Sequence, residues 1–484
     1  MLDIKAMWYI AKHKKRKRRT EMKKILCMLL IAVLAVSAVV AGGSSEVTTP
    51  TVEAGEGKVL NIYCWNTEFM NRITDHLPGY VPGADGTTTV DGDTSGTVEG
   101  KIGDVTVKFN ITPNKDNAYQ NNLDEALLNQ DKASADDKVD IFLVEADYAL
   151  KYVNDEASMA IKDLGITDAD IADQYKYTQD VVTDSNGVLK GLSWQACPGV
   201  MFYSREAAKE VFGTDDPAVI QEYVKDWDTF NETAKVLHDA GYSIVSSAAD
   251  TYRTYSNNVT SPWVVDGKIN IDENLMNWVN DSKALVDAGY IGTHDLWSDD
   301  WSRGFFPEGK VFAYFGPAWL VNFSMSADTE GSIGYNGGWA ATEGPQGFFW
   351  GGTWICAATG TDNVETIKDI MLNLTCNKDV MTEIVVQDDD FVNNKPTMEA
   401  LANGTELIDG KEYTSKVLGG QNPLPMYCAG VDGLDLSNLS DYDQACNEEF
   451  QKAMLDYMKG NVTLDTAISN FQKAVVTKHP DLTY

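Results

Sequence analysis

The feature that most constrains the fold is a regular alternation of β-rich apolar runs with segments of helical period. The runs Val59–Trp65 and Val139–Val144 are typical of buried strands, and Val105–Ile111 alternates like another strand. Between them, Asn117–Asn129 places apolar residues at helical spacing. Strand, helix and strand in this order indicate βαβ units and a parallel sheet.

The same alternation continues to the C-terminus. Further strands are predicted at Gly199–Tyr203 and Val311–Phe315, and further helices at Trp227–Ala240, Leu275–Ala288 and Val364–Cys376. Asp443–Val476 is predicted to form two amphipathic helices that are joined at Gly460 and Asn461. Pro78–Lys101 is rich in Gly, Thr and Asp and is predicted to be a loop or insertion outside the core. The predicted fold class is α/β, with helices on both faces of the sheets.

The N-terminus has the pattern of an export signal. Met22, Lys23 and Lys24 precede an apolar run to Val40, and Ala41 suits cleavage. We therefore predict a signal region at 1–41, with the signal peptide at 22–41 and a start-site extension at 1–21, then a flexible tether at 42–57. A retained membrane anchor is the alternative, because the apolar run is near the length of a membrane span. Residues 40–45 are similar to a lipoprotein box without its Cys, which argues against lipid anchoring.

The charge restricts the partners. The formal net charge of −33 includes +8 from residues 1–41, so the remainder carries −41. A chain this acidic repels nucleic acid and anionic membranes, and it suits a neutral or cationic small ligand. No nucleic-acid partner is expected.

Signatures of catalysis are scarce. The sequence has no GxSxG, P-loop, HExxH or dinucleotide motif, and its five histidines are dispersed. We predict no enzyme activity, no cofactor and no metal, and we interpret Asp388–Asp390 as a solvated loop. Six of the seven cysteines would remain after export, and their irregular spacing favours free buried thiols over disulfides.

Tryptophans supply the strongest sign of a binding site. Sugar rings stack on indoles while polar side chains bond the hydroxyl groups. Candidates for stacking, chosen beside polar residues or near strand ends, are Trp65, Trp194, Trp319 and Trp354. Candidates for polar contacts, which directly follow predicted strands where open α/β sheets bind ligands, are Asn66, Glu68, Glu145 and Asp147. Gln195, Tyr119 and Arg253 complete the predicted ligand-binding set. The alternative for each Trp is core packing.

Segments in the same order along the chain resemble the family 1 extracellular solute-binding proteins, the carbohydrate-binding subunits of ABC importers. The segments that carry the likeness are Val59–Met70, Tyr119–Leu128, Asp140–Val153, Gly191–Gly213, Trp227–Leu237, Gly309–Leu320, Gly351–Val364 and Met458–Gln472. The resemblance implies a two-lobed fold of the periplasmic-binding-protein type (type II), each lobe a mostly parallel sheet flanked by helices, with a hinge between the lobes. It places one lobe at 58–188 plus 345–390 and the other at 189–344 plus 391–484.

The resemblance also implies a function and partners. A sugar or oligosaccharide would be captured between the lobes and delivered to the permease subunits of an ABC importer by a monomer. Gly316–Trp319 is similar to the family segment whose Trp stacks on sugar, and Glu68, Asp147, Trp194 and Gln195 match positions that often face ligand. Two alternatives stay open: a binder of another solute, such as a peptide or polyamine, and a secreted glycoside hydrolase, which would need two suitably spaced carboxylates.

Overall fold

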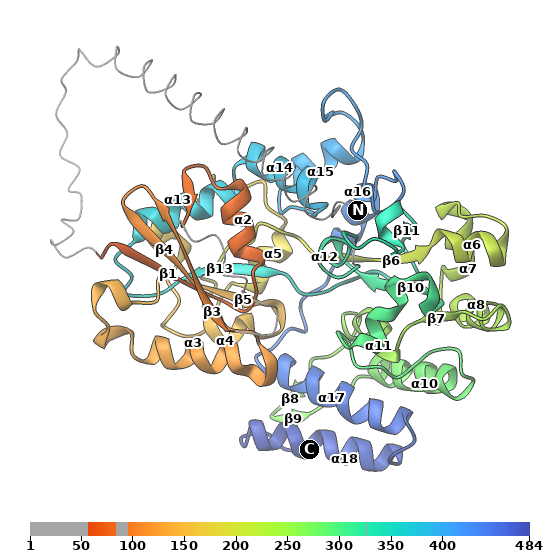
Figure 1. Cartoon of the computed structure of the whole chain (residues 1–484). Coiled ribbons are helices and arrows are strands. Elements are labelled where there is room, and N and C mark those ends of the chain that lie inside the picture. The colour runs from red at the N-terminus through yellow and green to blue at the C-terminus, as the bar shows by residue number, and fades with distance from the viewer. Residues whose placement is uncertain (1–56, 84–94, 326) are drawn as a thin grey trace, which may run out of the picture. The chain divides into compact units, whose positions relative to one another are not determined.

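The structure is a computed structural model that describes residues 57–83, 95–325 and 327–484 (Figure 1). The predicted signal region, Cys27, the predicted tether up to residue 56 and the middle of the predicted insertion, 84–94, lie outside the described residues. Everything below concerns the compact unit Gly55–Tyr484.

One half of this unit is built on a six-stranded sheet. Its strands lie in the order β13-β5-β1-β4-β3-β2, with bounds Thr353–Ala357, Ile141–Glu145, Val59–Cys64, Val105–Ile111, Gly96–Ile102 and Tyr80–Pro82. β1 pairs in parallel with β4 and with β5, as the βαβ pattern predicted. β13, β3 and β2 are antiparallel to their neighbours.

The other half is built on a five-stranded sheet. The strands β11 (Trp339–Thr342), β6 (Pro198–Ser204), β10 (Val311–Gly316) and β7 (Ser243–Val245) lie in this order, and β12 (Phe348–Phe349) also pairs with β6. Only β10 and β7 are parallel. A separate hairpin joins β8 (Val264–Val265) to β9 (Lys268–Ile269). Both main sheets are therefore mixed and not mostly parallel, because β2, β3 and β4 follow one another as antiparallel neighbours and because β11, β12 and β13 join the sheets late in the chain.

Helices cover both faces of the six-stranded sheet. In Figure 1, α2 (Glu68–His76) and α13 (Val364–Thr375) lie on one side of it, and α3 (Ala118–Leu128) and α4 (Ala149–Val153) lie on the other. The remaining helices are α5 (Lys176–Val181), α6 (Arg205–Phe212), α7 (Pro217–Val224), α8 (Trp227–Asp239), α9 (Tyr252–Ser256), α10 (Glu273–Asp287), α11 (Asp299–Ser302), α12 (Ala318–Phe323), α14 (Lys378–Asp388), α15 (Lys395–Ala402), α16 (Leu424–Val431), α17 (Asp443–Met458) and α18 (Leu464–Lys478).

Part of the predicted insertion belongs to the sheet. β3 pairs with β4 along its whole length, and β2 pairs with β3, so Pro78–Lys101 is not simply a loop. β3 lies near the sheet edge, and only Gly100 within it is fully buried. A strand with so little buried apolar surface needs few large apolar residues, which is why composition alone missed it.

Two segments cross between the sheets and pair with each other. Gln195 and Val392 form an antiparallel bridge, and the backbone N–H of Ala196 donates to the carbonyl of Phe391 over 2.9 Å. A third crossing follows β12, since Phe349 still pairs with the second sheet whereas Thr353 begins β13 in the first. The return to the first sheet therefore lies between Phe349 and Thr353.

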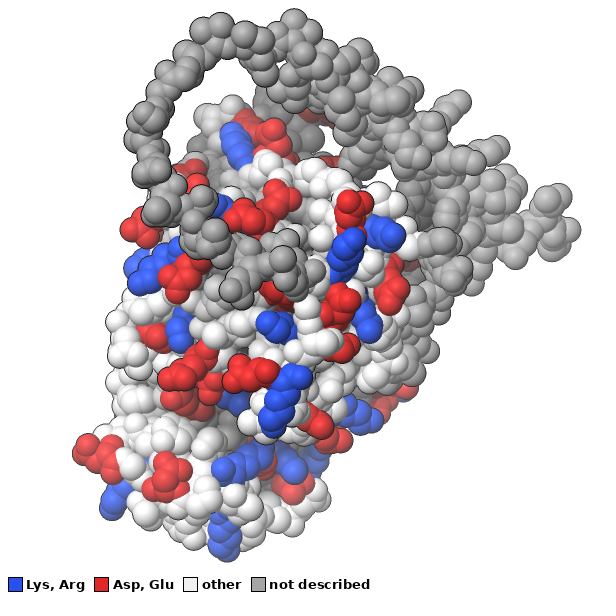
Figure 2. Space-filling model, turned by 90° about the vertical axis from the view of Figure 1, so that its left-hand side faces the viewer, with Lys and Arg blue, Asp and Glu red and all other residues white. Residues whose placement is uncertain are grey.

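The surface and the cysteines agree with the prediction in part. On the face shown in Figure 2, acidic and basic side chains are interspersed and no large basic patch is seen. The six cysteines of the described chain are free, and four of them are buried: Cys64, Cys197, Cys356 and Cys446. Among the described residues, no helix is long and apolar enough to cross a membrane.

Candidate functional site

A cavity of about 450 Å³ lies where the two sheets meet. This volume is within the usual range for small-molecule sites, roughly 300–1,000 Å³. Its lining comes from both halves of the unit: Trp65, Asn66, Glu68, Glu145, Gln195, Trp297, Trp319, Ser324, Trp350, Gly351, Gly352 and Thr353. A larger hollow of about 770 Å³, which includes Tyr175 and Lys395, has no Trp in its lining. Chemistry and not volume therefore marks the candidate site.

Three tryptophans form one wall. Trp319 lies in α12, directly after β10, and its indole N–H donates to the carbonyl of Trp350 over 3.1 Å. The rings of Trp319 and Trp350 meet edge-on with centroids 5.1 Å apart, and Trp297 lies 5.7 Å from Trp350. Trp297 is 54% exposed, so this wall presents indole surface that the fold itself does not cover.

Trp297 also has an unusual backbone. Its φ is +69°, in the left-handed region that bulky residues rarely adopt. Such strain tends to be retained where a residue contacts ligand. The combination of strain, exposure and a position over the cavity makes Trp297 a candidate ligand contact.

The opposite wall follows β1. Trp65 is half-buried and packs edge-on against Tyr119 and Tyr148, with ring centroids 5.5 Å and 6.3 Å away. The Asn66 side chain accepts a hydrogen bond from the backbone N–H of Glu68, which forms an Asx turn directly before α2. This turn brings Trp65, Asn66 and Glu68 to the cavity together.

Glu68 belongs to a buried network of charges. Its Oε1 accepts a hydrogen bond from the Gln195 side-chain amide over 3.1 Å, and the same amide group also contacts Asp390 at 3.3 Å. Arg72, one helical turn after Glu68, binds Asp390 at 3.0 Å and Asp388 at 2.6 Å. The network joins a cavity wall to the crossing segment near residue 390.

This network corrects one prediction. Asp388–Asp390 is not a solvated loop: Asp390 is 1% exposed, and Asp388 pairs with both Arg72 and His76. Asp389 accepts a hydrogen bond from the Tyr413 hydroxyl. The three carboxylates therefore have internal partners, which sequence could not show because Arg72 and His76 are more than 300 positions away.

The two cavity carboxyls share an electrostatic feature. Burial raises the pKa of Glu68 to about 7, Arg72 opposes that rise, and Asp390 adds to it. Burial also raises the pKa of Glu145, and the neighbouring Asp147 adds to the increase. Near neutral pH, Glu68 is therefore poised between its neutral and charged forms, and Glu145 favours its protonated form.

Gly351 and Gly352 shape the wall between Glu145 and the indoles. Both have positive φ, +67° and +111°, which favours glycine. A Cβ on Gly351 would lie 3.5 Å from Oε1 of Glu145 and 3.8 Å from the Trp319 indole. On Gly352, it would lie 3.0 Å from the ring of Trp354. Because Gly351 has no side chain, the carboxyl group of Glu145 and the indole of Trp319 both face the cavity.

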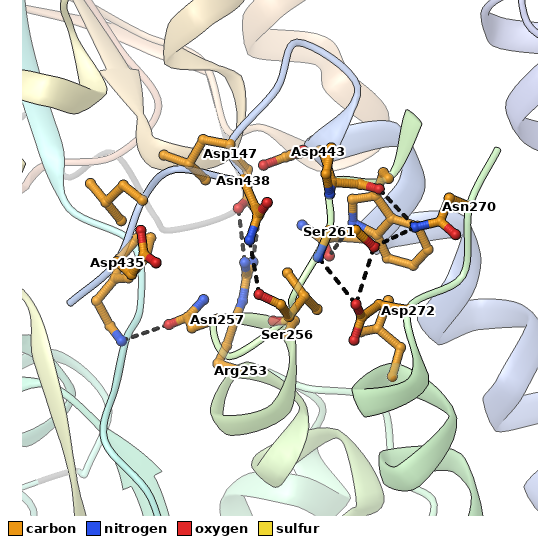
Figure 3. Close-up of a pocket in the computed structure, with 18 residues that line it drawn as sticks. Asp147, Arg253, Ser256, Asn257, Ser261, Asn270, Asp272, Asp435, Asn438 and Asp443 are labelled. Atoms are coloured by element: carbon orange, nitrogen blue, oxygen red, sulfur yellow. Dashed lines mark hydrogen bonds and ion pairs between the residues drawn. The ribbon is translucent and has the colours of Figure 1, made fainter. Parts of the chain in front are cut away.

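Two predicted residues lie in a different, smaller cavity (Figure 3). Arg253 of α9 forms a bidentate ion pair with Asp147, one contact measuring 2.8 Å. This cavity has about 40 Å³, which suits water and not a solute. Asp147 and Arg253 therefore do not line the large cavity: each satisfies the charge of the other.

Three further candidates are sealed in the core. Trp194 is 0% exposed and stacks on Phe69, with centroids 5.6 Å apart. Trp354 is 1% exposed and donates its indole N–H to the carbonyl of Thr178. Tyr119 is 0% exposed and donates its hydroxyl to the carbonyl of Leu143 over 2.6 Å. None of these side chains lines the cavity, so for them the alternative of core packing is the observed one.

The structure thus brings six predicted residues together and adds others. Those in the cavity lining are Trp65, Asn66, Glu68, Glu145, Gln195 and Trp319. Trp297 and Trp350 were missing from the predicted set, although both lie within about 30 positions of Trp319 in the sequence. Ser324, the two glycines and Thr353 gave no chemical signal in sequence.

Two mixed sheets linked by crossing segments, with an indole-lined cavity where they meet, define a two-lobed binding protein. Residues 99–411 match the family described as bacterial extracellular solute-binding protein. This match covers more than half of the chain, and the chain belongs to that family. The family resemblance inferred from sequence is therefore confirmed, as is the two-lobed α/β fold. The comparison with curated proteins gave no match.

Solved structures share the fold at low sequence identity. An extracellular solute-binding protein of family 1 is 15% identical with a TM-score of 0.66, over 87% of this chain and 99% of that one. An ABC-transporter-associated binding protein from Bifidobacterium animalis subsp. lactis Bl-04, in complex with β-1,6-galactobiose, is 20% identical with a TM-score of 0.61, over 88% and 99%. A galacto-N-biose/lacto-N-biose I-binding protein from Bifidobacterium longum, in complex with lacto-N-biose, is 14% identical with a TM-score of 0.61, over 87% and 97%.

Proposed function

We propose that this protein captures a sugar or short oligosaccharide in the indole-lined cavity and delivers it, unaltered, to the membrane permease of an ABC importer. The observation that carries the proposal is the lining itself: Trp65, Trp297, Trp319 and Trp350 offer ring faces and edges, and Glu68, Gln195 and Asn66 offer hydrogen-bonding groups. Stacking on indoles together with polar contacts to hydroxyl groups is the chemistry that saccharides require.

Capture would depend on relative motion of the two lobes. We place the lobes at 58–188 plus 350–390 and at 189–349 plus 391–484, with the paired crossing segments as the hinge. A ligand that contacts Trp65 on one side and Trp319 on the other favours a closed arrangement, because it binds that arrangement with more contacts. The galactobiose- and lacto-N-biose-binding proteins with the same fold support a saccharide as the ligand class.

The test is a titration of the purified mature chain with neutral mono- and disaccharides, followed by tryptophan fluorescence and isothermal titration calorimetry. We expect saturable binding of one saccharide per chain, and recovery of that saccharide intact after prolonged incubation. Accumulation of hydrolysis products would instead indicate a glycoside hydrolase. Binding of a peptide or polyamine without binding of any saccharide would contradict the proposal.

A further inference from the structure

The charges around the candidate cavity are unbalanced. Its described lining contains the carboxyl groups of Glu68 and Glu145 and no Lys or Arg. A saccharide with hydroxyl groups alone needs hydrogen-bonding partners, which amide and hydroxyl side chains also supply. Two carboxyl groups without a Lys or Arg in the same lining would in addition suit a ligand that brings its own positive charge.

The nearest cations are already engaged. Arg72 is 3% exposed and contacts Asp388 at 2.6 Å and Asp390 at 3.0 Å, whereas Glu68 lies 3.8 Å away. Arg253 is held by both carboxylate oxygens of Asp147. Each arginine thus has at least one closer acidic partner than the cavity carboxyl beside it.

Glu145 has one oxygen free to meet a ligand. Its Oε2 accepts a hydrogen bond from the backbone N–H of Asp147 over 2.7 Å. Its Oε1 faces the bare backbone of Gly351, where the indole of Trp319 also borders the open space. A carboxylate oxygen beside an indole is an arrangement that attracts an ammonium group, through the ion pair and through the ring electrons.

We propose that the ligand is an aminated disaccharide, which places a primary ammonium group at Oε1 of Glu145 and stacks a sugar ring on Trp319. This proposal rests on the proposed function and narrows its ligand class. The indole of Trp319 would bind the sugar ring, and the side chain of Glu145, through Oε1, would bind the ammonium group.

Binding of a cation at Glu145 should be linked to protons. The charged and titratable groups that act on Glu145 are Asp147 beside it, Arg253 of α9 and Glu448 of α17. Together with burial, they leave its pKa raised, so the free site holds a proton near neutral pH. An ammonium ligand favours the carboxylate and displaces that proton. Affinity for the aminated sugar should therefore rise as the pH is increased from 5.5 to 7.0.

The experiment is isothermal titration calorimetry of the mature chain with four probes. They are the β-1,4 dimer of glucosamine, its N-acetylated counterpart, cellobiose as the neutral glucose dimer, and spermidine as an amine without a ring. We expect the glucosamine dimer to bind at least tenfold more tightly than the two neutral dimers, with binding weakened by added NaCl. Proton release, measured in buffers of different ionisation enthalpy, should accompany only the aminated dimer.

Two variants isolate the carboxylate. Glu145→Gln should remove the preference for the aminated dimer, so that the ratio of its affinity to that of the neutral dimers falls to about one. Glu232→Gln, an equal charge change on the exposed face of α8, should leave every affinity unchanged.

Each other outcome overturns the proposal. Tight binding of a neutral dimer without preference for the amine, or a preference that survives in Glu145→Gln, refutes the aminated ligand and leaves sugar capture standing. Binding of spermidine alone refutes both proposals. Binding of none of the dimers refutes the aminated disaccharide, and the neutral-sugar titration then decides sugar capture separately.

Discussion

At the scale of single residues, Trp319 and Trp297 form the same wall but are supported differently. Trp319 is half-buried, and its ring is oriented by a hydrogen bond to the carbonyl of Trp350. Trp297 is largely exposed and lies on a strained backbone. The two residues should therefore respond differently to substitution.

Replacing Trp319 by Ala should weaken ligand binding at least tenfold, because the indole supplies a stacking surface that Ala lacks. The melting temperature should change only modestly, because the ring is half-buried: it borders the cavity as well as packing against the core. Calorimetric titration and thermal unfolding measure the two effects. Trp319→Phe is the matched control and should restore part of the affinity; unchanged affinity in Trp319→Ala would contradict the role.

Replacing Trp297 by Asn should weaken binding while stability is kept or increased. Asn tolerates the left-handed backbone that a bulky residue adopts at a penalty of roughly 1–2 kcal/mol. Chemical denaturation measures the stability, and titration with the same ligand measures the affinity. A marked loss of stability would show that Trp297 supports the fold and is not retained for ligand contact.

The residue scale also shows where sequence reasoning fails. Trp65 and Trp194 both lie beside polar residues in sequence, yet one lines the cavity and the other stacks on Phe69 in the core. Which of them meets solvent depends on helices and crossing segments distant in sequence. Glu145 and Asp147 show the same limit of sequence reasoning: Glu145 lines the large cavity, whereas Asp147 lies in the small one, where it pairs with Arg253 from a distant helix.

At the scale of elements, the periodicity of the sequence was a good guide. It predicted β4 with the observed bounds and β1, α8 and α13 to within a residue, because buried apolar faces impose their spacing directly. It missed β2 and β3, whose surface is mostly exposed. It also could not show that three polar residues of α2, spaced four apart, face inward: Glu68, Arg72 and His76.

That inward face of α2 depends on Arg72. Replacing Arg72 by Met should destabilise the protein by about 3–5 kcal/mol, because Asp388 and Asp390 would lose their buried counter-charge. Urea denaturation measures the change. Arg303, whose ion pair with Asp300 is exposed, provides the control: Arg303→Met should cost less than about 1 kcal/mol. Equal effects of the two substitutions would contradict the account of the network.

At the scale of the whole described unit, several carboxyls have raised pKa values. Burial is the main cause at Glu68 and Asp250, both raised to about 7, and at Asp443, also raised to about 7. The folded protein therefore binds more protons than the unfolded chain between about pH 4.5 and 7, and its stability falls as the pH rises through that window. Carboxyl groups whose pKa is lowered in the folded state, such as Asp272, make stability increase with pH, but only at more acidic pH.

We therefore expect the free energy of unfolding to be higher at pH 5 than at pH 7.5, with each buried carboxyl contributing up to about 3 kcal/mol. Urea denaturation at pH values from 5 to 7.5 measures the free energy of unfolding. In Glu68→Gln, whose side chain cannot titrate, the free energy of unfolding should change less steeply with pH. Stability that increases toward pH 7.5 would contradict the assignment.

The central claim is that the two lobes hold a saccharide between Trp65 on one side and Trp319 on the other. A crystal structure of the protein grown with the tightest-binding saccharide tests it most directly. The account predicts a sugar ring stacked on at least one of these indoles, with hydroxyl groups bonded to Glu68 and Gln195. A saccharide bound elsewhere on the molecule, with the indole-lined cavity filled only by solvent, would contradict it.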